Sequence, residues 1–338
     1  MSTADDLGGD LRIGAVPVKG RAWLAPLSGV TDAGFRRIAQ RFGAGVVVSE
    51  MVASDSRLSG CEEARLRAEG TGAAPHVVQL AGCIPGWMAD AARLAEAAGA
   101  DVIDVNMGCP AKRVVGGYAG SALMRDLDAA ERLLAATVRA VAVPVTVKMR
   151  LGWDDVSRNA AELARRAEAV GVRAVTVHGR TRQQFYKGRA DWAAIAAVVR
   201  AVSVPVIANG DVCSPDDARR CLLASGAAGA MVGRAAVGRP WLVGRIAAGL
   251  AGARWIEPSG PAKAAAALEH YDDLLGRYGI AVGVRHARKH LAAYADEAIR
   301  SGFAVPDTER RELVTSDAPK AVRGILARLF DRPERAAA

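Results

Sequence analysis

Polar residues stand at the ends of most of the short apolar segments in the first three quarters of this sequence. If those segments are parallel strands of a barrel, they end at one rim, and the loops that follow would bring these residues together. Any one of them, such as Gln79 or His178, is by itself more typical of a satisfied core side chain. Agreement among seven segments indicates a site. The segment ends are Pro26–Asp32, Gln79, Asn106–Pro110, Lys148–Arg150, His178–Arg182, Asn209–Asp211 and Gly233–Arg234.

Cys109 is the candidate for acid–base chemistry at this rim. An unperturbed thiol has a pKa of about 8.5, so it is mostly protonated at neutral pH and can donate a proton without activation. A nucleophilic cysteine would instead need a histidine or a helix terminus to form the thiolate. Cys109 lies between Gly108 and Pro110 on a predicted rim loop, whereas Cys213 and Cys221 are expected to be small core residues. We therefore predict that Cys109 is a general acid.

Two of the predicted loops carry glycines next to the starts of helices. Gly210 and Gly233 would free backbone N–H groups there, which is the usual phosphate site of such a barrel, and Arg234 would add a positive charge. Lys148 would place a cation in the barrel mouth. This combination suits flavin mononucleotide (FMN), because positive charge near the ring stabilises the anionic reduced flavin. Taken singly, the glycines could merely turn the chain, and the lysine could be a solvated rim residue.

The elements that would position these residues are eight short segments rich in β-branched residues. Most are apolar on both faces, as are strands of a parallel sheet covered by helices. Helical patterns lie between them, such as the apolar stripe of Ala130–Val141 and the capping residue Ser214 before Pro215. Eight strand–helix units over about 230 residues match a (β/α)8 TIM barrel. A doubly wound sheet is the alternative, but no Gly-rich G-x-G-x-x-G turn follows the first strand. The predicted strands are Ala22–Ala25, Val46–Ser49, His76–Leu80, Asp101–Asn106, Val143–Met149, Arg173–His178, Val204–Ala208 and Gly229–Gly233.

The strand signal ends after Pro258, and the rest of the chain has only helical spacing of apolar residues. Glu257–Pro261 is rich in Pro, Ser and Gly, which is typical of a linker. We therefore predict an α/β barrel domain over residues 1–255 and a small all-helical C-terminal domain over residues 256–332. The apolar stripes of that tail are Leu268, Tyr271 and Leu275, then Val284, Ala287, Leu291 and Tyr294, then Val322, Ile325 and Leu329.

The composition excludes several classes of protein. The chain has 338 residues, 51% of them hydrophobic, and a formal net charge of +9, which favours an anionic partner. No apolar run reaches the roughly 18 residues that a membrane span needs, and the acidic N-terminus lacks the basic region of a signal peptide. The five cysteines never form a C-x-x-C pair, so neither disulfides nor a metal site is expected. These features indicate a cytoplasmic protein with no membrane association and no evident obligate protein partner.

Together these residues resemble the tRNA-dihydrouridine synthases, and most closely their bacterial type-B branch. The resemblance extends over nearly the whole chain, in order, and the pairing of N-x-G-C-P with H-G-R-T-R is highly specific. It implies a flavin barrel followed by a helical domain. The matching motifs are A-P-L-S-G-V-T-D (Ala25–Asp32), V-Q-L-A-G (Val78–Gly82), D-V-N-M-G-C-P-A-K (Asp104–Lys112), V-K-M-R (Val147–Arg150), H-G-R-T-R (His178–Arg182), A-N-G-D (Ala208–Asp211), G-R-A-A-x-G-R-P-W (Gly233–Trp241) and A-R-K-H (Ala287–His290).

The resemblance also implies the reaction, which is reduction of the C5–C6 double bond of uracil in tRNA. NADPH would reduce FMN, the flavin would deliver a hydride to C6, Cys109 would protonate C5, and Asn106 would contact the base. The type-B resemblance favours the D-loop uridine at tRNA position 17. Leu27-Ser28 replaces the more usual Met-Ala, but backbone contacts to the flavin would survive that change. The residues implied to hold FMN are Pro26, Leu27, Ser28, Gln79, Lys148, His178, Asn209, Gly210, Asp211, Gly233 and Arg234.

A uridine stacked inside folded tRNA must be flipped out to reach a flavin at the bottom of a barrel, at a cost of a few kcal/mol. Contacts with the rest of the tRNA are expected to offset that cost, and basic side chains are available for them. Each could equally be an ordinary solvated residue. The predicted tRNA contacts are Lys112, Arg113, Arg180, Arg182, Arg285, Arg288 and Lys289, of which the last three share one helical face.

Two other functions stay open from the sequence. A small-molecule flavin reductase of the dihydroorotate or dihydropyrimidine dehydrogenase type would share the barrel, FMN and a loop cysteine or serine, but not a basic helical tail. A non-catalytic RNA-binding protein would have a degenerate site, whereas Cys109, Lys148 and His178 are all present.

Overall fold

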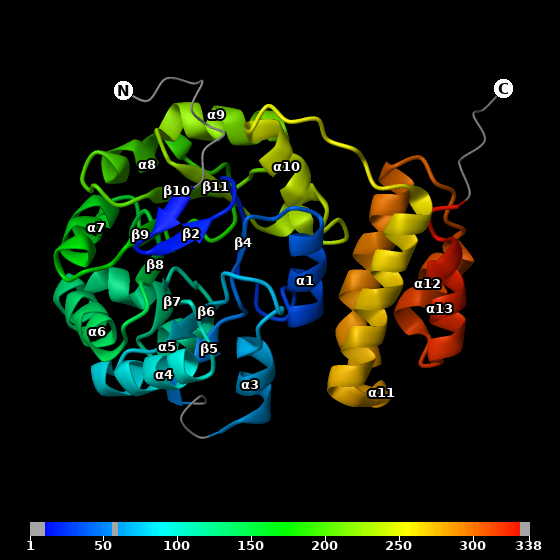
Figure 1. The fold of residues 1–338 in the computed structure, drawn as a ribbon, viewed down its shortest axis with the longest axis horizontal. Coiled ribbons are helices and arrows are strands. Elements are labelled where there is room, and N and C mark those ends of the chain that lie inside the picture. Colours follow the sequence, from blue (N-terminus) through cyan, green and yellow to red (C-terminus); the bar gives the residue numbers. More distant parts are fainter. Residues whose placement is uncertain (1–10, 56–59, 332–338) are drawn as a thin grey trace.

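The computed structural model describes residues 11–55 and 60–331. A barrel of parallel strands surrounded by helices lies beside a group of helices formed by the last part of the chain (Figure 1). This arrangement confirms the predicted fold class, a (β/α)8 barrel followed by an all-helical tail. The outer ends of the two predicted domains, residues 1–10 and residue 332, lie outside the described residues. No helix in the described part is both long enough and apolar enough to cross a bilayer.

The second strand of the barrel is broken into two short strands. The strands are β3 (Ala22–Leu24), β4 (Val46–Val47), β5 (Val52–Ala53), β6 (Val77–Ala81), β7 (Val102–Met107), β8 (Val145–Arg150), β9 (Ala174–His178), β10 (Val206–Asn209) and β11 (Gly229–Val232). The two short strands are β4, which pairs with β3, and β5, which pairs with β6, so the barrel closes at this point. The sheet runs in the order β4-β3-β11-β10-β9-β8-β7-β6-β5, and a bridge between Val48 and Val77 joins its two ends. Strands such as β11 are buried along their whole length, which is why their sequences are continuous apolar segments.

Helices cover the outside of the barrel (Figure 1). They are α1 (Ala33–Arg41), α3 (Glu62–Ala68), α4 (Pro85–Ala97), α5 (Lys112–Gly116), α6 (Leu127–Ala140), α7 (Ala160–Ala169), α8 (Trp192–Val199), α9 (Pro215–Ser225) and α10 (Leu242–Leu250), with short 3-10 helices η2 (Gly120–Arg125) and η3 (Arg234–Ala236). The predicted cap of α9 is confirmed, because the Ser214 side chain accepts the backbone N–H of Asp217.

An N-terminal β-hairpin, which the sequence patterns do not reveal, covers the end of the barrel at which the parallel strands begin. β1 (Leu11–Ile13) pairs antiparallel with β2 (Val16–Val18). Apolar residues of both strands are buried together with the first residues of β6, β7 and β9. Strands of three residues are too short for an alternating pattern to be recognised, and this end of the barrel lies opposite the predicted site.

The tail is built around a helical hairpin, α11 (Gly260–Arg300), which reverses direction at Gly279. Gly279 has a φ of 71°, a left-handed conformation that favours glycine. The rings of His270 and His290 lie 4.5 Å apart, whereas a straight helix would separate them by about 30 Å. α12 (Asp307–Thr315) and α13 (Pro319–Arg328) pack against the hairpin. The predicted apolar stripes form the core of the tail, with Leu268 at its edge.

Gly283 lets the two arms of this hairpin touch. A Cβ there would lie 2.7 Å from the carbonyl oxygen of Leu274, closer than a side chain can sit without moving the backbone. We expect Gly283→Ala to lower the free energy of unfolding by about 1–3 kcal/mol through overpacking. Gly276→Ala is the control in the first arm, where a Cβ meets nothing within 4 Å, and it should be neutral or mildly stabilising. Urea unfolding followed by circular dichroism measures both, and equal effects would contradict the close packing.

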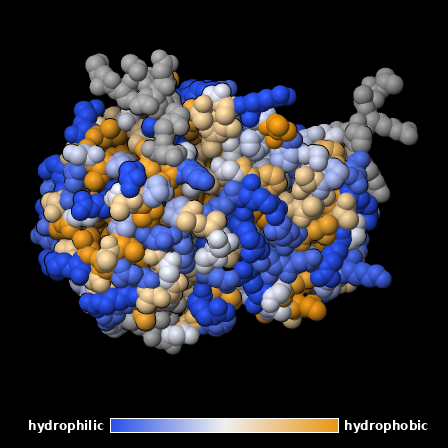
Figure 2. Space-filling view, in the orientation of Figure 1, coloured by the Kyte–Doolittle hydropathy of each residue, from blue (hydrophilic) through white to orange (hydrophobic). Residues whose placement is uncertain are grey.

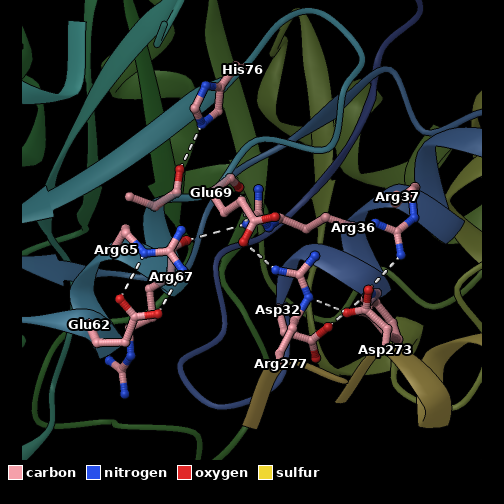
Figure 3. A network of polar contacts seen from close by, with 12 residues as sticks. Asp32, Arg36, Arg37, Glu62, Arg65, Arg67, Glu69, His76, Asp273 and Arg277 are labelled. Atoms are coloured by element: carbon pink, nitrogen blue, oxygen red, sulfur yellow. Dashed lines mark hydrogen bonds and ion pairs between the residues drawn. The ribbon is translucent and has the colours of Figure 1, made fainter. Parts of the chain in front are cut away.

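Ion pairs join the tail to the barrel at α1. Arg37 of α1 contacts Asp273 of α11, and Asp273 also pairs with Arg277, which reaches Glu69 just beyond α3 (Figure 3). Gly34 makes room for this contact, because a Cβ there would lie 2.5 Å from the Asp273 carboxylate. Hydrophilic residues lie along this boundary in the space-filling view (Figure 2). Charged contacts therefore hold this side of the tail against the barrel.

Candidate active site

The residues predicted from the strand ends lie side by side at one end of the barrel. The strand register sets Asn106 of β7 beside Lys148 of β8, Arg150 beside His178 of β9, and His178 beside Asn209 of β10. These residues are at or near the carboxyl ends of their strands, which form the rim where barrel enzymes carry out their chemistry. The barrel topology thus brings together residues that lie up to a hundred positions apart in the chain.

A chain of buried hydrogen bonds runs along this rim to the Cys109 loop. Thr146 Oγ1 and Gln79 Nε2 each donate to a different oxygen of Asp104, both at 2.6 Å. Asn106 Nδ2 then donates to Gln79 Oε1 at 2.8 Å. Asn106 Oδ1 accepts the backbone N–H groups of residues 108 and 109, at 3.2 and 3.0 Å. Because each amide orientation is set by its neighbour, Asn106 holds the backbone of Cys109 in place.

Asp104 is a residue of this chain of contacts that sequence reasoning missed. It is buried, and burial raises the pKa of its carboxyl group, although hydrogen bonds from Thr146 and Gln79 and the charge of Lys148 act in the opposite direction. Its role is to orient Gln79. An acidic residue in the middle of a strand that is mostly apolar is the signal that could have revealed it.

The Cys109 loop is anchored on both sides of the thiol. The carbonyl oxygen of Cys109 accepts the backbone N–H and the Oγ of Ser121, at 3.1 and 2.8 Å. Arg150 Nε donates to the carbonyl oxygen of Gly108 at 2.8 Å. Gly120, with a φ of 60°, approaches so closely that a Cβ would lie 2.9 Å from the Cys109 oxygen. Cys109 is half-buried and its thiol is free, so these contacts fix its backbone without using the sulfur.

Lys148 provides a cation at the rim. Its ammonium donates to Asn209 Oδ1 at 3.1 Å, and Asn209 is oriented by donating to the carbonyl oxygen of Met231 at 2.8 Å. Burial, and after it the charge of Arg150, lowers the pKa of Lys148 to about 8. An ammonium group has three N–H donors, and Asn209 is its one acceptor among the described residues. Two donors are therefore available to an acceptor that a ligand would supply.

His178 is held in its neutral form beside Lys148. Burial lowers its pKa well below the usual value, and the charges of Lys148, Arg150 and Arg180 add to this effect. Arg180 Nη1 lies 3.2 Å from His178 Nε2. A guanidinium can only donate, so Nε2 is the acceptor and the proton lies on Nδ1. The imidazole can therefore donate one hydrogen bond without adding charge to the rim.

Arg180 corrects one expectation, because it does not lie on the surface where a tRNA contact would be. Its side chain is 1% exposed and forms an ion pair with Asp211, with Nη2 2.6 Å from Oδ2. It also donates to the carbonyl oxygens of Lys187 and Gly188. The guanidinium is thus used within the protein, where it holds Asp211 and the loop that follows β9.

Tyr186 is a second residue that sequence reasoning missed. Its ring centroid lies 6.4 Å from that of His178, and the guanidinium groups of Arg150 and Arg234 lie 5.6 and 4.7 Å from it. The residue is 41% exposed. The aromatic pair Phe185-Tyr186 in an otherwise polar and basic loop is the signal that could have revealed it. An aromatic ring held at the rim in this way is suited to packing against a planar ligand.

Glycines after β10 and β11 shape the neighbouring part of the rim. Gly210 has a φ of 119°, and a Cβ there would lie 2.9 Å from the ring of His178. At Gly233 a Cβ would meet nothing closer than 3.8 Å, and the N–H groups at the start of the following η3 lack helical partners. Arg234 is exposed, with Nη2 3.4 Å from Asp211. These features leave space, backbone donors and positive charge for an anionic group.

The loop after β3 brings Pro26, Leu27 and Ser28 towards the same rim. Pro26 and Leu27 are half-buried and Ser28 is exposed. The backbone N–H of Leu27 donates to Thr31 Oγ1 at 2.9 Å, and its carbonyl oxygen accepts the N–H groups of residues 30 and 31. The turn is therefore closed by its own hydrogen bonds, and Ser28 is presented outward.

The other barrel residues predicted to contact tRNA do lie near the surface. Lys112 and Arg113 are exposed on α5, directly after the Cys109 loop. Arg182 is half-buried, with its guanidinium 4.9 Å from the ring centroid of Trp153. Lys112 and Arg113 are thus free to meet an anionic partner close to the thiol, whereas Arg182 is partly used by the aromatic contact.

The three predicted cations of the tail differ in their surroundings. Arg285 and Lys289 are exposed on α11, and Arg288 is half-buried and pairs with Asp317 at 2.9 Å. The ammonium of Lys289 reaches back to the barrel, where it would lie 3.4 Å from a Cβ placed on Gly29. The second arm of α11 therefore carries positive charge up to the loop that follows β3.

Nearly the whole chain matches one protein family. The family model described as dihydrouridine synthase (Dus) matches residues 23–322. A probable tRNA-dihydrouridine synthase of Rhizobium leguminosarum bv. phaseoli is 53% identical over 314 residues, which cover 93% of this chain and 96% of that protein. The tRNA-dihydrouridine synthase B of Xanthomonas campestris pv. campestris is 47% identical over 289 residues, 85% of this chain and 87% of that protein.

Solved structures share the barrel at low sequence identity. Histamine dehydrogenase from Rhizobium sp. 4-9 aligns with a TM-score of 0.55 and 16% identity, over 80% of this chain and 51% of that one. The 6-hydroxypseudooxynicotine amine oxidase from Pseudomonas geniculata N1 aligns with a TM-score of 0.58 and 15% identity, over 74% of this chain and 50% of that one. Identities this low show a common fold alone. On the family match and the curated relatives, the chain belongs to the dihydrouridine synthase (Dus) family.

Proposed function

We propose that this protein is a tRNA-dihydrouridine synthase that uses FMN and NADPH to reduce the C5–C6 double bond of uracil in tRNA. Membership of the dihydrouridine synthase family and relatives with tRNA-dihydrouridine synthase in their names support this reaction class. The observation that carries the proposal is the convergence at one rim of a free thiol, a half-buried ammonium with unused donors and a neutral imidazole.

The donors at the rim suit FMN. Lys148 offers N–H groups that the protein does not use, and the space and N–H groups after β11, with Arg234 nearby, suit a phosphate. When bound, FMN reduced by NADPH would supply the hydride for C6 of the uracil. Asn209 would act by holding Lys148, and Asp211 by holding Arg234 and the loop after β9. The proposed FMN residues are Pro26, Leu27, Ser28, Gln79, Lys148, His178, Asn209, Gly210, Asp211, Gly233 and Arg234.

Cys109 would supply the proton for C5. Saturation of a carbon–carbon double bond needs one proton for each hydride, and a positioned thiol can donate it. The contacts of Asn106, Ser121 and Arg150 with the loop keep Cys109 at the rim. An amide NH2 has two hydrogens, and the Asn106 amide gives one to Gln79, so one is available to the base.

The tRNA would approach across the rim towards the tail. Lys112 and Arg113 beside the thiol, and Arg285 and Lys289 on α11, would contact phosphates and help to offset the cost of flipping out the uridine. The similarity to a type-B enzyme favours the D-loop uridine at position 17. Such a substrate and NADPH would both be met in the cytoplasm.

Spectroscopy of the purified full chain, together with modification of isolated tRNA, tests the proposed function. We expect a yellow protein that releases FMN on denaturation, is bleached by NADPH, and forms dihydrouridine in the D-loop of tRNA from a strain lacking dihydrouridine synthases. Free uracil and orotate are the comparison substrates. A colourless protein that does not bind added FMN would overturn the proposal, and reduction of the free bases without reduction of tRNA would favour the small-molecule reductase.

The exposed tail cations should contribute to tRNA affinity. We expect the double substitution Arg285→Ala with Lys289→Ala to weaken tRNA binding. The slope of log Kd against the logarithm of the salt concentration should fall by about one to two, because each phosphate contact releases about one counterion. Arg323→Ala is the matched control, since Arg323 lies on α13 and pairs with Asp272. Filter binding over a range of salt concentrations measures both. An unchanged affinity and salt slope in the double variant would place the tail outside the tRNA interface.

A further inference from the structure

Asp32 joins the loop after β3 to both the barrel and the tail. It ends the A-P-L-S-G-V-T-D motif that carries the proposed FMN residues Pro26–Ser28. The Asp32 side chain is buried, and its Oδ1 accepts the N–H of Phe35 at 3.0 Å, which caps α1. Its Oδ2 lies 3.0 Å from His270 Nε2 on the first arm of α11. One carboxylate therefore connects the loop, α1 and a residue 238 positions away in the tail.

His270 is arranged as a donor to this carboxylate. Burial acts against ionisation of Asp32, but His270 and His290 together hold its pKa well below the usual range. An ionised carboxylate can only accept, so His270 Nε2 carries a proton and donates it to Asp32, and His270 Nδ1 lies 3.1 Å from the hydroxyl of Tyr294. Both nitrogens of His270 and both oxygens of Asp32 thus have partners within the protein.

His290 supports this pair from the second arm of the hairpin. It ends the A-R-K-H motif, in which Lys289 is a proposed tRNA contact while His290 has no role in the proposed reaction. Its ring packs edge-on against that of His270, with centroids 4.5 Å apart, and its Nε2 lies 3.8 Å from Asp32 Oδ2. His290 is 2% exposed, so a histidine is buried where the two arms of the hairpin meet the loop.

Further hydrogen bonds hold the loop that ends at Asp32. Arg36 Nε donates to the carbonyl oxygen of Thr31 at 3.0 Å, and the backbone N–H of Gly29 donates to Glu50. Gly29, Asp32 and Glu50 line a small pocket together with His290 and its neighbour Lys289. The two arms of α11 thus cover the side of the loop away from the barrel core.

A metal ion is a second possible role for these groups, because one ligand atom from each of Asp32, His270 and His290 lies within 4.8 Å of the others. The contacts favour direct hydrogen bonding. His270 already donates to Asp32 at hydrogen-bond distance. A metal-bound histidine usually donates its other ring N–H to an acceptor, whereas His290 Nδ1 has no hydrogen-bond partner in the described part of the chain.

We propose that His270 and His290 are positioning residues for the FMN-binding loop 26–32, so that the helical tail completes the cofactor site in addition to contacting tRNA. The inference rests on the proposed function for its cofactor, but the contact between loop and tail stands without it. The physical reason is that Asp32 is the first capping residue of α1 and the last residue of the loop, so loss of its tail partner would free both.

Hydrogen exchange and FMN binding by the full-length protein test this inference. His270→Ala should increase amide exchange at residues 27–31 in the protein freed of flavin, and should weaken FMN binding by about tenfold, because a hydrogen bond to a buried carboxylate is lost. His270→Gln, whose amide can replace the Nε2 donor, should restore most of both. Val322→Ala is the stability control, since Val322 is buried in the tail core away from Asp32.

The outcomes distinguish a positioning role of His270 from a general effect on the stability of the tail. They also distinguish a failure of this inference from a failure of the proposed function. If Val322→Ala, with an equal loss of tail stability, changes loop exchange and FMN affinity as much as His270→Ala does, the positioning role is overturned. Stoichiometric metal in the purified protein that His290→Ala removes would overturn it in favour of a metal site. If the protein binds no FMN, the proposed function fails, while loop exchange still decides whether the tail holds the loop.

Discussion

Replacing Cys109 by alanine should lower the rate of dihydrouridine formation by about 10²–10⁴-fold, the usual contribution of a positioned general acid. The loop should keep its shape, because the backbone of Cys109 is held by Asn106 Oδ1 and by Ser121, and none of these contacts uses the thiol. Bound FMN and its reduction by NADPH should therefore be unchanged. Single-turnover oxidation of the reduced enzyme by tRNA, compared with flavin content, measures the two effects separately.

Two further cysteine variants sharpen this prediction. Cys83→Ala removes another half-buried free thiol and should leave the rate unchanged. Cys109→Ser keeps a hydroxyl at the same position, but a hydroxyl is a much weaker acid than a thiol, so the rate should stay low. Full activity of Cys109→Ala would show that solvent or another group provides the proton.

Lys148→Met should have opposite effects on flavin affinity and on the stability of the protein freed of flavin. The ammonium donors that Asn209 leaves unused are the proposed flavin contacts, so their loss should weaken FMN binding by roughly 100-fold. The same lysine is half-buried, and the loss of water around its charge has a cost, which lowers its pKa to about 8. Removing it should raise the free energy of unfolding of the flavin-free protein at pH 7 by at most about 3 kcal/mol.

The pH dependence of that stability difference follows from the lowered pKa. Below pH 8 the lysine is charged in both the folded and the unfolded chain, and the folded chain bears the full cost of burying the charge. Between about pH 8 and pH 10.5 the folded protein loses the proton while the unfolded chain keeps it. The stability of the natural protein should therefore rise relative to Lys148→Met across this window. Urea unfolding of both flavin-free proteins at several pH values measures the difference.

Lys263→Met provides the matched control for a buried lysine. Lys263 is buried in the tail, but its ammonium pairs with Glu257 at 2.8 Å. Its substitution removes a satisfied ion pair, so it should not stabilise the protein and should not change FMN affinity. A loss of FMN affinity in this variant equal to that of Lys148→Met would argue against a direct role of Lys148.

The barrel and the tail could be predicted from the sequence because their signals are local. A strand buried on both faces is apolar throughout, and a helix packed on one face repeats its apolar residues every three or four positions. The division of the second strand into β4 and β5 and the hairpin of β1 and β2 could not be predicted in this way, because pieces of two or three residues carry no period. The helical stripes of α11 were predicted, but its reversal at Gly279 depends on a single backbone conformation.

The candidate site could likewise be predicted in part from the sequence. The polar types at the strand ends, the Gly-Cys-Pro loop and the basic residues are properties of the sequence, and once a barrel is assumed they must meet at one rim. Which of them faces a ligand depends on partners far away in the chain. Arg180 is buried because Asp211 lies beside it, 31 residues later, and Asp32 is tied to His270 across 238 residues. Residue types and local periods therefore determined the architecture and the kind of chemistry, while the tertiary structure decided which charges are used internally, since only packing brings distant partners within hydrogen-bond distance.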